Sequence, residues 1–306
     1  MTTTSRAGAS TSHIERTATE PRRESLHGVF LSRVEQVNDK IRLLRLAIPE
    51  DSPPVKFLSG QWVDTFVPGL PKPGGFTLTS TPADVHPSVS RFATDGDPHG
   101  YLELAVQESP KNPPAAWLWQ PVTDIVGKEL HVRVGGSFVW PHNPPSTHIR
   151  EVKRYVFIAG GVGVNPLMSI ISHLGQIQNL PYEIRFIYTV KDPRPTGKVS
   201  EILFLNRLAK LFGSGKVKGE LILYLTPAST MTSQQDGSIE TEEGKVRYKN
   251  RRMTNADVLD VLGPVKERGR TVCYVCGIPT MTDELVEFSQ QAEGMDPHNV
   301  LFERWW

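Results

Sequence analysis

The chain has 306 residues, 38% of them hydrophobic and 22% charged, and its formal net charge is +1. This balance gives no basic footprint for nucleic-acid binding, and no apolar run reaches the ~20 residues of a membrane-spanning helix. Two cysteines, Cys273 and Cys276, exclude a disulfide framework, a four-cysteine zinc site and a cysteine-ligated iron–sulfur cluster within the chain. We expect a globular protein of two domains, with no metal site.

Residues 1–25 are rich in Ser, Thr and Arg. Glu15, Glu20 and Glu24 dilute the positive charge, and no apolar helical stripe is present. The segment is therefore expected to be a disordered tail, with a weak mitochondrial presequence as the alternative.

Between residues 26 and 143, six short apolar segments are separated by Gly and Pro: GVFLSRVEQV, IRLLRLAI, GQWVDTFVPG, GGFTLTSTP, GYLELAVQE and ELHVRVGGSF. Only a brief helical segment at 115–119 interrupts them. This rhythm predicts about six antiparallel strands arranged as a barrel or a sandwich. The polar, proline-rich residues 141–151 predict a linker.

From 152 to 306, apolar strands alternate with helical segments, starting with the continuous apolar run RYVFIAG. One helix is expected to begin with Ser200 as N-cap, and another to run between Thr254 and Gly263. The alternation predicts an α/β domain with a parallel sheet covered on both faces. Residues 229–252 are polar without clear periodicity, and we expect a loop or insertion there.

The motif AGGVGVNP, residues 159–166, follows a predicted strand and opens a predicted helix. Glycines in this setting allow a tight turn and a close approach of the backbone to a phosphate. Pro166 suits the first helical position, where its missing N–H costs nothing. The alternative is a simple tight strand-to-helix connection.

A second turn, CGIPTM at residues 276–281, also follows a predicted strand. Ligands of open α/β sheets bind outside the carboxyl ends of the strands, so this turn is expected to present the sulfur of Cys276 to a ligand. The alternative is an ordinary turn with a buried cysteine. Cys273 lies three residues earlier on the same strand and points to the opposite face, which favours a small buried hydrophobe over a redox pair.

The last residues, FERWW, place Glu303 beside aromatic residues at the end of a predicted strand. Terminal tryptophans often fray or pack as core. Here Trp305 or Trp306 is a candidate to stack on a flat ring system next to Glu303.

A barrel followed by GGxGxxP, CGxxxM and a terminal Glu-x-aromatic resembles the ferredoxin–NADP reductase superfamily, in which a flavin barrel precedes a nicotinamide domain. A closer resemblance is to the oxidoreductase NAD-binding domain-containing protein 1 family, through HIERTA, GQWVD, GGFTLTSTP, NPPAAW, VRVGG, AGGVGVNPL, CGIPTMTD and FERWW. It covers residues 13–306. It implies an FAD-binding barrel domain at 26–143 and an NAD(P)-binding domain at 152–306.

The superfamily's flavin motif, Arg-x-Tyr-Ser/Thr, falls on Gly74, Gly75, Phe76 and Thr77. The resemblance implies that the Thr77 hydroxyl hydrogen-bonds near flavin N5 and that the Phe76 ring packs on the flavin. Gly74 replaces the arginine that pairs with the flavin phosphate, a contact worth roughly 1.5–3 kcal/mol. Backbone amides of the two glycines, arranged as a nest, or Lys72 are expected to substitute in part.

Two further barrel motifs match the superfamily less closely. Its Gly-x-x-Ser/Thr turn under the flavin pyrophosphate falls on Asn112 and Ala115, so the hydroxyl is missing. The turn with Gly135 and Gly136 resembles the one that closes the flavin barrel, and a plain hairpin turn is the alternative.

In the second domain the resemblance implies that the dinucleotide pyrophosphate and nicotinamide lie against Gly160, Gly161, Gly163, Pro166, Cys276, Gly277, Met281, Glu303, Trp305 and Trp306. Thr77, Cys276 and Glu303 are the expected catalytic residues. They would position nicotinamide C4 against flavin N5, while the cofactors supply the redox chemistry.

The sequence favours NAD over NADP. Lys191, Arg194 and Lys198 follow the second strand of this domain and could meet a 2′-phosphate. The third strand, however, ends in LTPAST, without the Ser-Arg pair of NADP-using relatives.

The leading hypothesis is an FAD-dependent NAD(P)H oxidoreductase that passes electrons to a separate protein or small-molecule acceptor. A second is a regulatory protein that binds the dinucleotide without turnover, favoured by Gly74 and Ala115 and opposed by Thr77, Cys276 and Glu303. A thiol oxidoreductase using Cys273 and Cys276 is a third. The family resemblance implies a mitochondrial location, and the N-terminal composition a cytoplasmic one.

Overall fold

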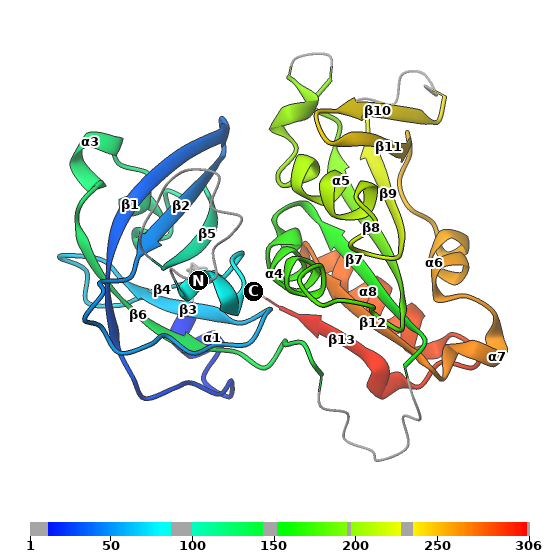
Figure 1. The fold of residues 1–306 in the computed structure, drawn as a ribbon, viewed down its shortest axis with the longest axis horizontal. Helices are drawn as coiled ribbons and strands as arrows, with labels where there is room; N and C mark the ends of the chain where they lie inside the picture. Colours follow the sequence, from blue (N-terminus) through cyan, green and yellow to red (C-terminus); the bar gives the residue numbers. More distant parts are fainter. Residues whose placement is uncertain (1–11, 87–99, 143–151, 195–196, 228–234, 305–306) are drawn as a thin grey trace, which may run out of the picture.

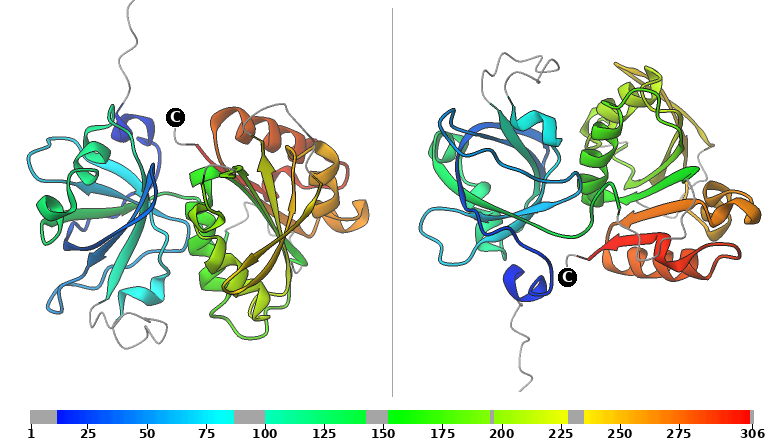
Figure 2. Two further views of the ribbon diagram at one scale, coloured as in Figure 1. Left: turned by 90° about the horizontal axis from the view of Figure 1, so that it is seen from above. Right: turned by 60° about the horizontal axis from the view of Figure 1, so that its bottom comes forward.

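The computed structural model describes residues 12–86, 100–142, 152–194, 197–227 and 235–304. The chain forms two domains that lie side by side (Figures 1 and 2). The strands of the first are β1 (His27–Asn38), β2 (Ile41–Ala47), β3 (Trp62–Phe66), β4 (Gly74–Thr77), β5 (Tyr101–Gln107) and β6 (Glu129–Gly135). Its short helices are α1 (His13–Arg16), α2 (Pro113–Leu118) and α3 (Val122–Ile125).

All strand pairs of the first sheet are antiparallel, in the order β4-β3-β6-β1-β2-β5. A bridge between Leu78 and Leu104 joins the two edges and closes the barrel. Alternate residues such as Leu44, Leu102 and Leu130 are fully buried inside it. The predicted six-stranded antiparallel barrel is confirmed.

The second domain contains the other seven strands: β7 (Arg154–Gly160), β8 (Glu183–Lys191), β9 (Gly219–Thr226), β10 (Gly237–Thr241), β11 (Gly244–Lys249), β12 (Thr271–Cys276) and β13 (Val300–Glu303). Its helices are α4 (Val164–Leu174), α5 (Leu205–Gly213), α6 (Asn255–Leu262), α7 (Val265–Arg268) and α8 (Pro279–Gln291). The strand order is β10-β11-β9-β8-β7-β12-β13, and all pairs are parallel except β10 with β11. The predicted α/β domain is confirmed.

The β10–β11 hairpin occupies residues expected to form a loop. Ile239 and Val246 face each other in its register and are both buried. Two apolar positions are too few to give a visible period. The hairpin is stable because β11 adds to the edge of the parallel sheet beside β9.

The helix expected from Ser200 begins later. Residues 199–201 form a short 3₁₀ turn, and Phe204 has a φ of 61° directly before α5. This break lets Ile202, Leu203 and Phe204 all be buried, which one helical face would not allow. Thr254 and Gly263 do bound α6, as predicted.

The tail expected over residues 1–25 is wrong for its described part. His13 of α1 is buried, and Arg22 bridges to Gly135 of β6 and donates to Asp64 of β3 over 3.0 Å. The segment is ordered because a buried carboxylate on the barrel needs these partners. Residues 1–11 and most of the expected linker, 143–151, lie outside the described part of the chain.

Helix α4 lies between its own sheet and the barrel (Figure 1). Its Asn165 donates to the carbonyl of Ala105 over 3.0 Å, and its Ser169 donates to the carbonyl of Ser80 over 2.6 Å. The two domains are thus joined by packing and by direct hydrogen bonds.

Candidate active site

The carboxyl ends of β7, β12 and β13 place three predicted residues in one row. Cys276 is the register partner of Ala159 on one side and of Glu303 on the other. Cys276 is fully buried and Glu303 is 9% exposed. The two turns and the terminal glutamate lie together because parallel neighbours end at one edge of the sheet, and the roles of Cys276 and Glu303 toward a cofactor stay predictions.

The two glycine turns pack directly on each other. A Cβ at Gly160 would lie 2.6 Å from the Met281 methyl and 3.3 Å from the Cα of Gly277, and a Cβ at Gly163 would overlap the carbonyl of Cys276. Gly161 alone needs its conformational freedom, since its φ is 54°. The absence of side chains at Gly160 and Gly163 therefore lets the two turns pack against each other, in addition to any close approach of the backbone to a phosphate.

Pro166 is not the first helical residue. Helix α4 begins at Val164, and Pro166 is its third residue. Its missing N–H is still harmless, because the first turn of a helix has no internal acceptors for these groups.

The cysteines do not form a redox pair. Cys276 packs toward α4 and the barrel side, whereas Cys273 packs with Val258 and Leu285 on the opposite face. Neither cysteine is in a disulfide, both are buried, and burial raises the pKa of Cys273 to about 12. A thiol with so raised a pKa stays protonated near neutral pH, so nucleophilic chemistry at Cys273 is disfavoured.

We expect the native protein to react slowly with a thiol reagent such as DTNB at pH 8, and both cysteines to react at once after unfolding in guanidinium. The same reaction with the Cys273→Ser variant shows which of the two cysteines gives any labelling seen in the native protein. Fast labelling of a native thiol would restore the thiol oxidoreductase hypothesis.

In the flavin-type motif, both glycines lie in strand β4 with no positive φ. A nest requires αR–αL backbone, so the predicted amide nest is wrong: the antiparallel pairing with β3 holds the segment extended. A Cβ at Gly74 would lie 2.7 Å from the Cβ of Pro114 and 2.8 Å from the Phe76 ring, and one at Gly75 would overlap the imidazole of His13. Neither position has room for an arginine.

Phe76 and Thr77 are both buried, at 9% and 6% exposure. The Phe76 ring joins the barrel core, and Thr77 is the register partner of Trp62. Trp62 in turn pairs with Gly135. A Cβ at Gly135 or Gly136 would lie 2.5–2.6 Å from the Trp62 ring, so these glycines make room for the indole.

Helix α2 is poorly suited to bind an anion at its start. Asn112 is its N-cap without a side-chain capping bond, and its first two residues, Pro113 and Pro114, carry no N–H. Ala115 is buried. A helix this short, without its first amides, offers little to a phosphate.

A pocket of about 500 Å³ lies beside these two motifs. Its wall is formed by residues 12, 13 and 16 of the α1 segment, 70–73 before β4, and 109 with 111–114 before and in α2. Arg16, Lys72 and Lys111 give this wall three basic side chains. Lys72 is predicted from the sequence but Arg16 and Lys111 are not, because nothing in the sequence shows that α1 and the start of α2 line the same pocket.

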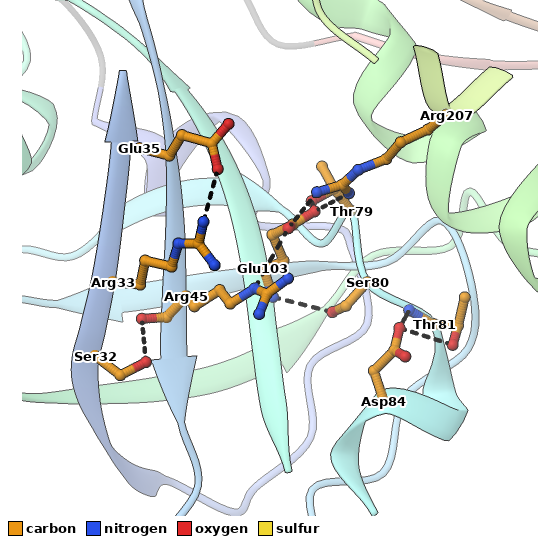
Figure 3. A network of polar contacts seen from close by, with 10 residues as sticks. All are labelled: Ser32, Arg33, Glu35, Arg45, Thr79, Ser80, Thr81, Asp84, Glu103 and Arg207. Carbon is orange, nitrogen blue, oxygen red and sulfur yellow. Dashed lines mark hydrogen bonds and ion pairs between the residues drawn. The ribbon is translucent and has the colours of Figure 1, made fainter. Parts of the chain in front are cut away.

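The hydroxyl-rich end of the motif joins the two domains. Thr79 donates to Glu103 of β5 over 2.9 Å, and Ser80 accepts the Glu103 amide over 3.0 Å. Arg207 of α5 binds the same carboxylate with two nitrogens, at 2.5 and 2.8 Å (Figure 3). Burial raises the pKa of Glu103, but the Arg207 charge and its hydrogen bonds outweigh this and lower it below the usual value.

Arg194 is already engaged at the end of β8. Its side chain donates to both carboxylate oxygens of Asp192 over 2.9 Å and lies 4.8 Å from the centre of the Tyr248 ring. Tyr248 belongs to β11, so the added hairpin completes this arrangement. An arginine held in this way is less available to a 2′-phosphate.

Two predicted site residues are not described, and the described residues show neither a metal-binding cluster nor a membrane-spanning helix. Trp305 and Trp306 lie outside the described residues. Among the residues that are described, no group of three or more His, Cys, Asp or Glu side chains could hold a metal ion. No helix within the same ranges is long and apolar enough to cross a membrane.

Known proteins resemble the chain over its whole length. The human oxidoreductase NAD-binding domain-containing protein 1 is 30% identical over 317 residues, which cover 100% of this chain and 88% of the relative. The chain belongs to this family. The family model for the ferric reductase NAD binding domain also matches residues 153–290.

Two solved structures share the fold of this family member. The CS-b5R domains of human Ncb5or, in an NAD⁺ form, superpose with a TM-score of 0.62 at 17% identity, covering 91% of this chain and 69% of that one. A ferredoxin NADP⁺ reductase from Neisseria gonorrhoeae, with bound FAD and NADP, gives a TM-score of 0.60 at 14% identity, covering 93% of this chain and 100% of that one. The two-domain reductase architecture predicted from sequence is therefore confirmed.

Proposed function

We propose that the protein is an FAD-dependent NAD(P)H oxidoreductase that delivers electrons to a separate acceptor. The observation that carries this proposal is the row formed by Cys276 and Glu303 beside the glycine turns. Strand β13 runs toward the barrel and ends at this row (Figures 1 and 2). A thiol and a carboxylate at the carboxyl ends of neighbouring parallel strands, on the end of the sheet nearer the barrel, suit hydride transfer between two bound rings.

The residues have distinct expected roles. The turns with Gly160, Gly161 and Gly163 would hold the dinucleotide, and Cys276 and Glu303 would orient its nicotinamide. Thr77 would offer its hydroxyl to the flavin. The flavin supplies hydride acceptance and onward electron transfer when bound, and the protein supplies orientation and exclusion of water.

NADH is the proposed reductant. Arg194, the arginine that follows β8, donates hydrogen bonds to both carboxylate oxygens of Asp192 and is therefore less available to the 2′-phosphate of NADPH. Fluorescence titration with NADH and NADPH tests this preference, and tighter binding of NADPH would reverse it.

The function is tested by purifying the protein, supplying FAD, and following flavin bleaching on anaerobic addition of NADH. We expect flavin absorbance to appear and to bleach with NADH. Protein that shows no flavin absorbance and no FAD-dependent NADH oxidation would refute the proposal.

Replacement of Glu303 by Gln should slow flavin reduction by roughly tenfold or more, because a positioned charged group contributes on this scale to the transition state. FAD affinity should not change. Glu284→Gln, at an exposed position on α8, is the matched control. Equal reduction rates in both variants would remove Glu303 from the catalytic set.

A second candidate is a regulatory protein that binds the dinucleotide without turnover. It is favoured by the absence of space for an arginine at Gly74 and by the apolar Ala115. Stoichiometric NADH binding with no flavin reduction would select it.

A mitochondrial location is proposed from the family resemblance alone. A fluorescent protein fused to residues 1–30 tests it: mitochondrial signal supports the proposal, and diffuse cytoplasmic signal supports the alternative.

A further inference from the structure

The α1 segment occupies the place that the flavin-type motif leaves open. Gly75 has no side chain, and the His13 imidazole fills that space. His13 Nε2 lies 3.0 Å from Oδ1 of Asp64, a fully buried carboxylate on β3, and its ring meets Trp62 edge-on at 4.7 Å. This anchoring holds α1 against the barrel.

The same helix presents Arg16 to the pocket of about 500 Å³. Lys72 and Lys111 face this pocket from the segments before β4 and before α2. Glu15 lies 3.7 Å from Lys72 and partly neutralises it. Lys111 forms no ion pair within the described ranges, and it leaves the wall with net positive charge.

Neither of the usual backbone sources of anion binding is present here. The amides of Gly74 and Gly75 belong to an extended strand, and Pro113 and Pro114 carry no amide hydrogen at the start of α2. Gly74 cannot be replaced by an arginine without displacing Pro114 and the Phe76 ring. Charge for a phosphate must therefore come from side chains around the pocket.

We propose that Arg16, together with Lys111, binds the phosphate groups of the flavin nucleotide, so that the N-terminal helix replaces the arginine missing from β4. The ligand class is a flavin mono- or dinucleotide, recognised through its phosphates. This inference rests on the proposed function, because it assigns the anchor of the same flavin.

The test is equilibrium titration of the apoprotein with riboflavin, FMN and FAD, followed by flavin fluorescence. We expect the two phosphorylated flavins to bind more tightly than riboflavin. Arg16→Ala and Lys111→Ala should each weaken FAD binding by roughly tenfold, because a single charged contact to a phosphate contributes about a factor of ten in affinity. Riboflavin has no phosphate, and both side chains are exposed, so riboflavin binding should not change. Arg33→Ala, at an exposed arginine of β1, is the control and should bind all three flavins as the native protein does.

Gly75→Ala provides an independent arm. The added methyl should displace His13 and with it α1, so FAD affinity should fall as in Arg16→Ala while far-UV circular dichroism stays native. ADP should compete with FAD in the native protein and more weakly in Arg16→Ala.

The outcomes separate the two claims. If Arg16→Ala binds FAD as tightly as Arg33→Ala does, Arg16 is not a phosphate anchor. The same follows if Arg16→Ala weakens riboflavin binding as much as it weakens FAD binding. Either result overturns the proposed anchor and leaves the proposed flavin enzyme intact. Loss of NADH affinity in Arg16→Ala without loss of FAD affinity assigns the pocket to the other cofactor and also overturns the anchor. A native protein that binds none of the three flavins overturns the proposed function itself, and the anchor with it.

Discussion

Arg207→Ala should lower the free energy of unfolding by about 2 kcal/mol at pH 7. Among the described residues, the variant leaves the Glu103 carboxylate, which is 3% exposed, with a hydrogen bond from Thr79 and a more distant Arg45 at 3.9 Å. Removing one partner of a buried ion pair typically costs about 3–5 kcal/mol. The value here is smaller because the Arg207 side chain is 42% exposed and water screens part of its charge.

The effect depends on pH with a defined sign. The pKa of Glu103 is lowered in the folded protein, so the stability that it contributes is fully present above the unfolded value of 4.5 and is lost as pH falls through the folded value. The difference between native and variant protein should therefore shrink below about pH 4.5.

Urea unfolding at pH 7 and at pH 4, followed by tryptophan fluorescence, measures both effects. Lys210→Ala is the control on the same helix, because Lys210 and its partner Glu243 are exposed and such pairs contribute little. Stability of Arg207→Ala equal to that of Lys210→Ala would show that the interdomain ion pair contributes nothing.

Gly163→Ala should be at least as damaging, and it should also impair dinucleotide binding. Gly163 has a φ of −62°, which any residue adopts, so backbone strain is not the cause. The added methyl would overlap the carbonyl of Cys276, a backbone atom that no side-chain rotation can move. The two glycine turns must separate, at a cost of about 1–3 kcal/mol or more.

Thermal unfolding and NADH titration test this prediction together. We expect a lower melting temperature and an NADH affinity reduced by roughly tenfold, equivalent to about 1.4 kcal/mol. Gly269→Ala is the matched control: its φ is −61°, and its Cβ would lie 3.7 Å from the nearest atom. Native NADH affinity in Gly163→Ala would separate the packing of the turns from cofactor binding.

Local patterns were sufficient to predict the architecture. The six barrel strands and the alternating second domain follow from the spacing of apolar residues and turn formers, and Thr254 and Gly263 bound their helix by local capping. The row of Ala159, Cys276 and Glu303 was predictable for a similar reason. Parallel strands end at one edge, so motifs that follow strands meet there.

The residues missed in the sequence act through contacts between distant segments. Glu103 and Arg207 are 104 positions apart, and neither has a pattern that names its partner. The hydroxyls of Thr79 and Ser80, at the end of the predicted strand segment GGFTLTSTP, hold Glu103 in place.

The sequence by itself determined the two domains, their strands other than the β10–β11 hairpin, and the glycine turns, because these depend on residues close together in the chain. Only the tertiary structure decided what the glycines of β4 are for. Gly74 admits the Phe76 ring and Pro114, and Gly75 admits His13 of a segment expected to be disordered. The physical reason is that the space at a glycine can be interpreted only when its neighbours are known, and Pro114 and His13 lie 40 and 62 positions away from these glycines along the chain.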